Sequence, residues 1–309
     1  MSPILSICIP TFKRIDITRK AIASIYANLD GVQLNDFEVI VSDNDPEKSS
    51  EVFKKEFKYS NFHYYATKCE GFLNSYYVLG YGKGLFLKLH NNSCLLNKGS
   101  LLYLVNQIKF LSKEKPLLFY TNGMLNRKKL LKYNSTDEFY KSLSYFMSWS
   151  AGFGIWKDDY EQITITNISD MFPQTSLLLS CKNKNLFYID DTLIYGGIPV
   201  PQKGGYNPYK VFGEVFMDLI KNALEDNIIS NETFGIIKKE LLNKYLASRY
   251  FKTVILRKDK FETSDISKHL KKYYGSYAFS RLLLFKFRKF NLQLLIYKCR
   301  KYVSYLPPC

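Results

Sequence analysis

Three short polar segments, each directly after a run of apolar residues, carry the side chains best suited to binding chemistry. They are Pro10–Arg14, Ser42–Asp45 and His90–Ser93. Carboxylates accept hydrogen bonds, amides both donate and accept them, and guanidinium groups pair with anions such as phosphates. This mixture predicts a site for a polar or anionic ligand, if separate elements of the fold bring the three segments together.

Two common nucleotide-binding patterns are absent from these segments. A dinucleotide-binding site needs Gly-x-Gly-x-x-Gly after its first strand, but here no glycine occurs before Gly31. A P-loop is also excluded, because the glycines of Gly80–Gly84 precede an apolar run instead of following one. Six scattered cysteines without C-x-x-C spacing, beside three histidines, do not predict a zinc site, and we expect reduced thiols.

Alternating strand and helix patterns must position the three segments. Short apolar runs predict strands at Ile4–Ile9, Phe37–Val41, Phe62–Tyr65, Leu85–Leu89 and Pro116–Tyr120. Apolar residues at helical spacing predict helices between them, at Ile15–Tyr26, Glu51–Phe57, Asn74–Leu79 and Ser100–Leu111. This order predicts an α/β fold with a doubly wound, mostly parallel sheet, in which ligands bind at the carboxyl ends of the strands.

The second half of the chain has a less regular pattern. It predicts a helix near Thr175–Ser180, strands near Leu186–Ile194, and helices at Val211–Leu224 and Asn231–Ala247. We therefore expect two parts, an α/β domain over residues 1–210 and a helical, basic region over residues 211–309.

Ser6–Arg14, Phe37–Asn44 and Lys88–Ser93 resemble the opening motifs of family 2 glycosyltransferases with the GT-A fold. The first two motifs match in residue type, order and spacing, and the resemblance covers residues 4–110. It implies an inverting transferase that moves a sugar from a nucleoside diphosphate donor to an acceptor hydroxyl. With its loop Lys203–Asn207, the chain is most similar to transferases that build bacterial surface polysaccharides, of the O-antigen or capsule type.

The resemblance also implies the residues that bind the donor. It assigns to Asp43 a hydrogen bond with the edge of the nucleobase, which an acceptor-only carboxylate can make. The other donor-binding residues are Pro10, Thr11, Phe12, Arg14, Asn44, His90, Asn91, Asn92 and Ser93. Two alternatives stay open: Asp43 as a turn residue that caps the next helix, and Arg14 as a partner of a local carboxylate.

His90–Ser93 departs from the family pattern, in which an Asp-x-Asp sequence holds a divalent metal at this place. Neutral amides bind Mg²⁺ or Mn²⁺ far less well without a carboxylate beside them. Three interpretations stay open: an inactive relative, a diphosphate positioned by His90, Asn91 and Ser93 with cations elsewhere, or a weaker metal site completed by the diphosphate. We expect weak or absent dependence on Mg²⁺ or Mn²⁺, and the metal ligands stay unknown.

The second half supplies candidates for the general base and for further contacts. An inverting transfer needs a base to take the proton of the acceptor hydroxyl, and the resemblance favours Asp170, with a helix cap as the alternative. Asp190 and Asp191 are expected at a strand end or on the surface. Lys203 lies beside two glycines that allow an anion to approach, unless its loop is an ordinary exposed turn. The acceptor-binding candidates are Trp149, Ser150, Gly152 and Tyr206.

The charge of the chain is high and unevenly spread. An apolar content of 46% is that of a globular protein, but Lys and Arg total 44 against 28 Asp and Glu, a net charge of +16. Residues 267–309 hold ten Lys and Arg and no acid, and four of these, Arg281, Lys286, Arg288 and Lys289, flank an apolar stripe that begins at Phe279. The pattern predicts an amphipathic helix that lies on an anionic membrane, with core packing as the alternative.

The remaining expectations concern partners and location. No motif that reads nucleic acid accompanies the basic charge, so nucleic acid is not expected as a partner. The amino-terminal residues read as a strand and not as a signal peptide. We expect a cytoplasmic protein, peripheral at the inner face of the plasma membrane, that acts on a glycan or a polyprenyl-diphosphate-linked acceptor.

Overall fold

The computed structural model describes residues 2–164, 168–182, 184–200, 204–276, 278, 280 and 282. The chain divides into two compact units. The first unit comprises Met1–Pro201 and Ala223–Thr233, and the second comprises Gln202–Asn222 and Phe234–Cys309. The expected boundary near residue 210 falls within the second unit, and the sequence pattern gave no sign that Ala223–Thr233 returns to the first.

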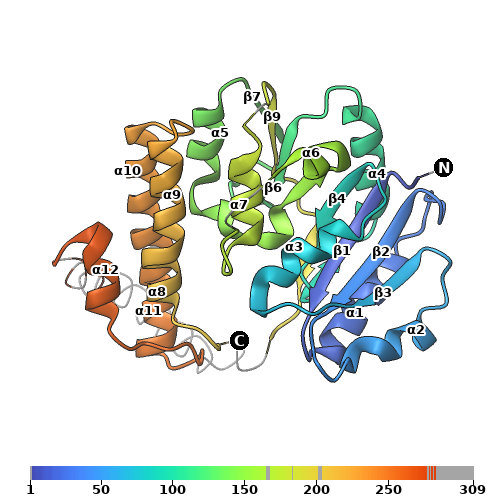
Figure 1. Cartoon of the computed structure of the whole chain (residues 1–309), viewed down its shortest axis with the longest axis horizontal. Helices are drawn as coiled ribbons and strands as arrows, with labels where there is room; N and C mark the ends of the chain where they lie inside the picture. The colour runs from blue at the N-terminus through green and yellow to red at the C-terminus, as the bar shows by residue number, and fades with distance from the viewer. Residues whose placement is uncertain are drawn as a thin grey trace, which may run out of the picture. The chain divides into compact units, whose positions relative to one another are not determined.

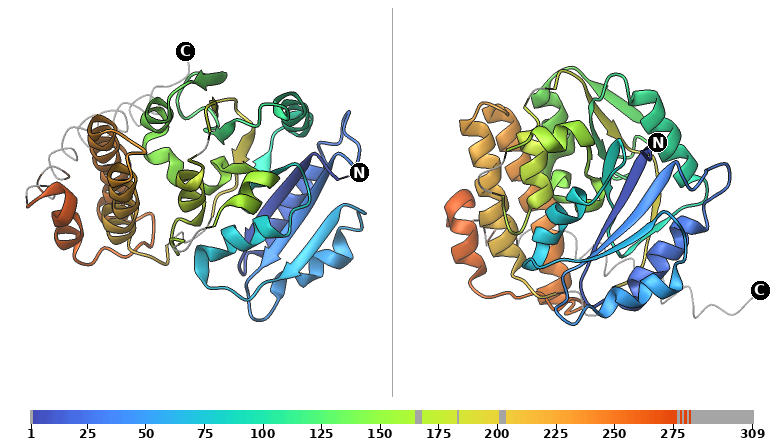
Figure 2. Two further views of the ribbon diagram at one scale, coloured as in Figure 1. Left: turned by 45° about the horizontal axis from the view of Figure 1, so that its top comes forward. Right: turned by 45° about the vertical axis from the view of Figure 1, so that its right-hand side comes forward.

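A five-stranded sheet organises the first unit (Figure 1). Its strands, in the order β3-β2-β1-β4-β8, are β3 (Phe62–Ala66), β2 (Phe37–Asp43), β1 (Leu5–Thr11), β4 (Phe86–Leu89) and β8 (Gly154–Trp156). All neighbours are parallel except β8, which runs antiparallel to β4. Both views in Figure 2 show β1, β2 and β3, in blue, twisted side by side. The predicted α/β fold with a mostly parallel sheet is confirmed.

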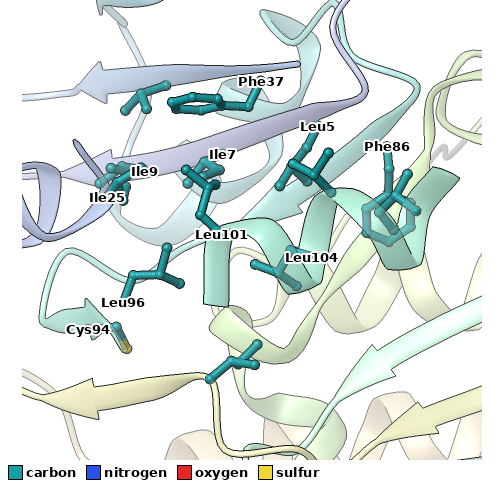
Figure 3. Close-up of a cluster of buried hydrophobic side chains, with 14 of the residues drawn as sticks. Leu5, Ile7, Ile9, Ile25, Phe37, Phe86, Cys94, Leu96, Leu101 and Leu104 are labelled. Carbon is teal, nitrogen blue, oxygen red and sulfur yellow. The ribbon is translucent and has the colours of Figure 1, made fainter. Parts of the chain in front are cut away.

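Helices cover both faces of this sheet, which explains why β1 and β2 are buried along nearly their whole length. On one face, α1 (Ile15–Tyr26) and α4 (Ser100–Leu111) pack on alternate strand residues. Figure 3 shows Leu5, Ile7 and Ile9 of β1 gathered with Ile25 of α1 and Leu101 of α4. On the other face, α3 (Asn74–Gly80) follows the short turn η2 (Gly71–Leu73) and contacts β1, β2 and β4.

The rest of the first unit consists of short elements. The turn η1 (Ser49–Val52) leads into α2 (Phe53–Glu56) after β2. Two small sheets pair β5 (Cys94–Leu96) with β10 (Tyr195–Gly197), and β9 (Phe187–Asp190) with β6 (Leu117–Tyr120) and β7 (Leu130–Tyr133). The helices are α5 (Thr136–Leu143), η3 (Ser144–Ser148), η4 (Ser150–Gly152), α6 (Lys157–Gln162) and α7 (Pro173–Ser180). The predicted strand at Pro116–Tyr120 therefore exists, but in a separate sheet.

The second unit is helical. One continuous helix runs from α8 (Pro208–Lys210) through η5 (Val211–Phe216) into α9 (Met217–Glu225). Another runs through α10 (Asn231–Glu240), η6 (Leu241–Leu246), α11 (Ala247–Tyr250) and η7 (Phe251–Ile255), and α12 (Ile266–Tyr274) follows. Rings of Phe212 and Tyr245, 4.3 Å apart between centroids, join the two long helices. No helix in the described ranges is long and apolar enough to cross a membrane.

Candidate functional site

The three polar segments meet at one edge of the sheet. Thr11 and Asp43, the last residues of β1 and β2, are paired in register, and Leu89, the last residue of β4, pairs with Cys8. The backbone N–H of His90 donates to the Cys8 carbonyl at 2.8 Å. Pro10–Arg14, Ser42–Asp45 and His90–Ser93 therefore lie together, as parallel strands require, and we call them the polar edge.

A network of neutral hydrogen bonds holds the β1–β2 side of the polar edge. Its centre is Asn74 of α3, which donates to the Ser42 carbonyl at 2.8 Å and to Asn44 Oδ1 at 3.1 Å. Asn74 Oδ1 accepts from Ser42 Oγ at 2.5 Å, and Ser42 Oγ also contacts Thr67 Oγ1 at 2.6 Å. Asn44 in turn donates to the carbonyls of Cys69 and Gly71. The sequence analysis did not single out Asn74, whose only signal is a polar residue at the start of an apolar helical pattern.

Asp43 is buried within its own turn. Its Oδ1 accepts from the Asp45 N–H at 3.0 Å, and its Oδ2 accepts from the Ser50 N–H at 2.9 Å and from the Tyr64 hydroxyl at 3.3 Å. These are the contacts of a residue that caps the turn η1, the alternative that the sequence left open. A direct contact between Asp43 and a nucleobase stays a prediction.

His90 and Asn92 direct their polar atoms toward protein partners. Asn92 Nδ2 lies 3.3 Å from the hydroxyls of both Thr11 and Thr18. His90 is 1% exposed, and burial lowers its pKa to about 4, so the ring is neutral. Because a carbonyl oxygen only accepts, the contact of 3.0 Å between Nε2 and the Cys94 carbonyl places the ring proton on Nε2.

The residues at this place do not fit the divalent metal that the family resemblance implies. Mg²⁺ and Mn²⁺ prefer carboxylate oxygens, whereas His90 donates a hydrogen bond to a carbonyl and Asn92 turns its amide nitrogen to two hydroxyls. Within the described part of the chain, no group of three or more His, Cys, Asp or Glu side chains could hold a metal ion.

Asn91, Ser93, Trp149 and Ser150 are half-buried and form the open part of the β4 side. Ser150 Oγ donates to Asn91 Oδ1, which joins the turn η4 to the end of β4. The ring of Trp149 lies 6.2 Å from the ring of Tyr195, which in turn lies 5.1 Å from His90, measured between centroids. Gly152 is different, because a Cβ there would stand 2.3 Å from the Phe119 ring, so it is a core position.

Lys88 lies beneath this part of the edge and is the charged residue that the sequence analysis missed. It is 1% exposed, and its Nζ donates to the carbonyls of Leu89, at 3.3 Å, and Ala151. The ammonium group lies 4.4 Å from the centroid of the Tyr120 ring and 5.4 Å from that of Tyr195. Burial lowers the pKa of Lys88 to about 7.

The loop after β1 places two cations beside the edge. Phe12, Lys13 and Arg14 are exposed, and Lys13 Nζ lies 3.9 Å from Asp45 Oδ1. Arg14 is the residue before α1, and its side chain makes no capping hydrogen bond to that helix. Its predicted contact with a phosphate stays a prediction.

The carboxylates predicted in the second half have distinct surroundings. Asp170 is exposed and lies just before α7. Asp190 ends β9 and accepts from Tyr103 and Gln107. Burial acts to raise the pKa of Asp191, but hydrogen bonds from Thr121 and three backbone N–H groups bring it below its usual value. Asp190 and Asp191 are thus buried at a strand end and not on the surface.

Two further candidates lie outside the described part of the first unit. Tyr206 belongs to the second unit, where its ring packs 4.9 Å from that of Phe261. Lys203 lies outside the described residues, as does the apolar stripe that begins at Phe279.

Comparison with known proteins shows the fold. No family model and no curated protein matches the sequence. The crystal structure of S. aureus TarS 1–349 is similar at a TM-score of 0.57 and 13% identity, over 82% of this chain and 75% of that one. The crystal structure of TarS 1–349 in complex with UDP-GlcNAc has a TM-score of 0.53 and 13% identity, over 81% of this chain and 73% of that one. The mannosyltransferase PcManGT from Pyrobaculum calidifontis, in complex with GDP-Man and Mn²⁺, has a TM-score of 0.55 and 10% identity, over 92% of this chain and 85% of that one. The predicted GT-A type of fold is confirmed.

Proposed function

We propose that this protein is an inverting glycosyltransferase that moves a sugar from a nucleoside diphosphate donor to a hydroxyl of a glycan acceptor. The observation that carries the proposal is the meeting of the three motif segments at the carboxyl ends of β1, β2 and β4. Ligands of such sheets bind at that edge. Two of the similar structures hold UDP-GlcNAc and GDP-Man, which supports a nucleotide sugar as the donor.

The donor is proposed to lie along the polar edge from β2 to β4. Phe12, whose side chain is 49% exposed, offers an apolar face to the base beside Asn44. The diphosphate then lies over Asn91 and Ser93, whose half-buried amide and hydroxyl groups can donate hydrogen bonds to it. Divalent cations are proposed to have a weak effect, because His90 and Asn92 do not fit one.

The acceptor is proposed to react on the side of α7. Asp170 is exposed there and is the proposed base that takes the proton of the attacking hydroxyl. Trp149 is half-buried near Ser150 and offers a ring face on which a sugar can stack.

The charge of the second unit supports a membrane as a further partner. This unit contains 21 Lys and Arg against 6 Asp and Glu, whereas the first unit contains 23 against 22. Anionic lipids attract such a basic segment, with about 1 kcal/mol for each Lys or Arg near the surface. We propose that the second unit attaches the protein to the inner face of the plasma membrane, where a lipid-linked glycan is the acceptor. The pathway, of O-antigen or capsule type, rests on the family resemblance alone.

Release of a nucleoside diphosphate tests the proposed function. The full chain is incubated with a panel of UDP- and GDP-sugars, with glycan acceptors added, in the presence of Mg²⁺, Mn²⁺ or a chelator. We expect release of UDP or GDP that depends on the acceptor and persists in part with the chelator. Binding of a nucleotide sugar without release under any condition would identify an inactive relative, and absence of binding would remove the donor site altogether.

A further inference from the structure

Lys88 is a buried ammonium group whose surroundings lack a counter-ion. It lies in the middle of the sheet, where β4 pairs with β1 on one side and with β8 on the other. Its Nζ finds two backbone carbonyls, of Leu89 and Ala151, and the faces of two tyrosine rings. In the described part of the chain, no carboxylate lies within ion-pair distance of Lys88.

The groups that face Lys88 from the packed elements are almost all neutral. Burial raises the pKa of Cys8 on β1, of Tyr120 on β6 and of Tyr195 on β10, so these groups keep their protons. His90, which directly follows β4, is neutral because the same burial lowers its pKa.

Two groups of β5 and β9 complete the surroundings. Cys94 is a buried cysteine, and Asp190 is a carboxylate whose charge acts on Lys88. Asp190 already accepts hydrogen bonds from Tyr103, Gln107 and the Thr192 N–H. A negative charge shared among these donors attracts the ammonium group from a distance but does not pair with it.

This arrangement makes the charge of Lys88 depend on what lies at the polar edge. Removing an ammonium group from water without pairing it is unfavourable, and a buried lysine responds by releasing its proton. Burial has this effect on Lys88, whose pKa falls to about 7. A negative ligand brought close reverses the effect, because an opposite charge favours the protonated form.

Lys88 lies directly behind the place where the diphosphate is proposed to bind. Its Nζ donates to the carbonyl of Ala151, and the neighbouring Ser150 donates to Asn91. The same lysine thus holds the turn η4 against the end of β4 and brings a positive charge to the base of the polar edge. It is a positioning residue, since its 1% exposure leaves no surface for direct contact with a ligand.

We propose that Lys88 supplies positive charge that stabilises the donor diphosphate at Asn91–Ser93, and that the diphosphate binds together with a proton taken up from solvent by the Lys88 amine. The proposal rests on the proposed donor site. No bond of the nucleotide sugar changes in this step; the neutral amine gains one proton and becomes an ammonium ion.

Calorimetry in two buffers of different ionisation enthalpy tests this coupling. UDP-GlcNAc and GDP-Man are titrated into the full chain at about pH 8, where most Lys88 amines are neutral and a diphosphate diester does not itself titrate. We expect proton uptake on binding, seen as a heat that differs between the buffers. In Lys88→Met the uptake disappears and the affinity falls on the order of tenfold, because the positive charge behind the diphosphate is lost.

Two further variants separate charge from fold. Lys88→Gln keeps a donor for the Ala151 carbonyl without a titrating group, and we expect it to lose the proton uptake as Lys88→Met does. Lys83→Met removes an exposed lysine just before the same strand and should bind as the parent does. Proton uptake that survives in both Lys88 variants, or binding by the parent without uptake, would overturn the proposal.

A failure of the proposed function gives a different result. If the parent binds no nucleotide sugar, the donor site is wrong, and inorganic pyrophosphate then becomes the probe. If pyrophosphate binds and its proton uptake is smaller in Lys88→Met than in the parent, the coupling between Lys88 and a bound anion is supported. The anion site would then serve a function other than sugar transfer. Absence of pyrophosphate binding as well would overturn both proposals.

Discussion

The two sides of the polar edge bury polar groups in opposite ways. On the β1–β2 side, the uncharged Ser42, Asn44 and Asn74 give one another donors and acceptors, and the buried Asp43 carboxylate accepts from two N–H groups and the Tyr64 hydroxyl. On the β4 side, Lys88 places a charge among aromatic rings and carbonyls. A reciprocal neutral network fixes the shape of a loop, whereas an ammonium group without a counter-ion makes its surroundings responsive to charge.

This difference predicts that the two sides contact different parts of the proposed donor, the β1–β2 side the base and the β4 side the diphosphate. The base needs a fixed surface, and the hydrogen bonds of Asn44 to Cys69 and Gly71 extend the network to the loop that follows β3. The diphosphate needs positive charge nearby. In the family that the motifs resemble, a metal ion supplies this charge, but His90 and Asn92 do not fit a metal ion. The two sides should therefore respond differently to substitution, pH and ionic conditions.

The largest effect is expected outside both sides, since neither offers an exposed carboxylate to the acceptor hydroxyl. Asp170→Asn should lower the turnover by roughly 10²–10⁴, because the amide keeps the shape but cannot accept the proton. Donor affinity, measured by calorimetry, should stay unchanged, and exposed Asp30→Asn serves as the control.

Turnover near that of the parent would remove Asp170 from the role of base. The nearest substitutes are already engaged: Asp159 pairs with Lys184 at 2.6 Å, and Asp191 accepts from Thr121 and three N–H groups. Such a result would shift the role of base to another acid of the chain, and Asp159 or Asp191 could take it only by giving up one of these partners.

The next effect concerns the neutral side. Asn74→Ala leaves the carbonyl of Ser42 and the amide oxygen of Asn44 without their shared donor in a buried place. We expect the free energy of unfolding to fall by about 2–4 kcal/mol, as for several unsatisfied buried groups. Chemical denaturation measures it, with half-buried Asn97→Ala as the control. A loss as small as that of the control would show that the network adds little to the fold.

The sequence predicted the strands, their order and the meeting of the three polar segments better than the contacts that the individual side chains make. Strands such as Phe37–Val41 were predictable because a parallel strand covered on both faces is a continuous apolar run. The meeting of Thr11, Asp43 and His90 followed from strand order alone. The GT-A type of fold came from the motif resemblance, and the similar structures agree with it.

What the sequence could not predict depends on three-dimensional partners. The capping contacts of Asp43 come from Ser50 and Tyr64, which no local pattern connects to it. Gly152 looked like a pocket residue, but the Phe119 ring, far away in sequence, fills the space beside it. Lys88 is the first residue of the motif Lys88–Ser93, but the sequence did not predict a role for it. Only the fold shows that this lysine points into the core.

A smaller effect distinguishes the two roles of Asp43. Asp43→Ala removes the acceptor for the Asp45 and Ser50 N–H groups, so the free energy of unfolding should fall by about 1–2 kcal/mol. If Asp43 also contacts the base, nucleotide affinity should fall about tenfold, or about 1.4 kcal/mol. Tyr64→Phe, which removes only the 3.3 Å contact, is the control. Unchanged calorimetric affinity for UDP and GDP in a folded Asp43→Ala protein would leave Asp43 as a cap alone.

The smallest effect is a pH dependence of stability above about pH 7 that we expect from the β4 side and not from the β1–β2 side. The lysine side chain of the unfolded chain keeps its proton up to its ordinary pKa of 10.5, whereas folded Lys88 releases it near 7 because it is buried. Between these values the unfolded state binds more protons, so the free energy of unfolding contributed by Lys88 rises with pH. Below about pH 7 both states are protonated, and this contribution no longer changes. We expect a rise of about 1 kcal/mol from pH 7 to pH 8, measured by denaturant unfolding as the difference between the parent and Lys88→Met. Asn74→Ala should keep the slope of the parent at a lower stability. Parallel curves for the parent and Lys88→Met would mean that Lys88 keeps its proton in the fold, and the contrast between the two sides would then be one of shape and not of charge.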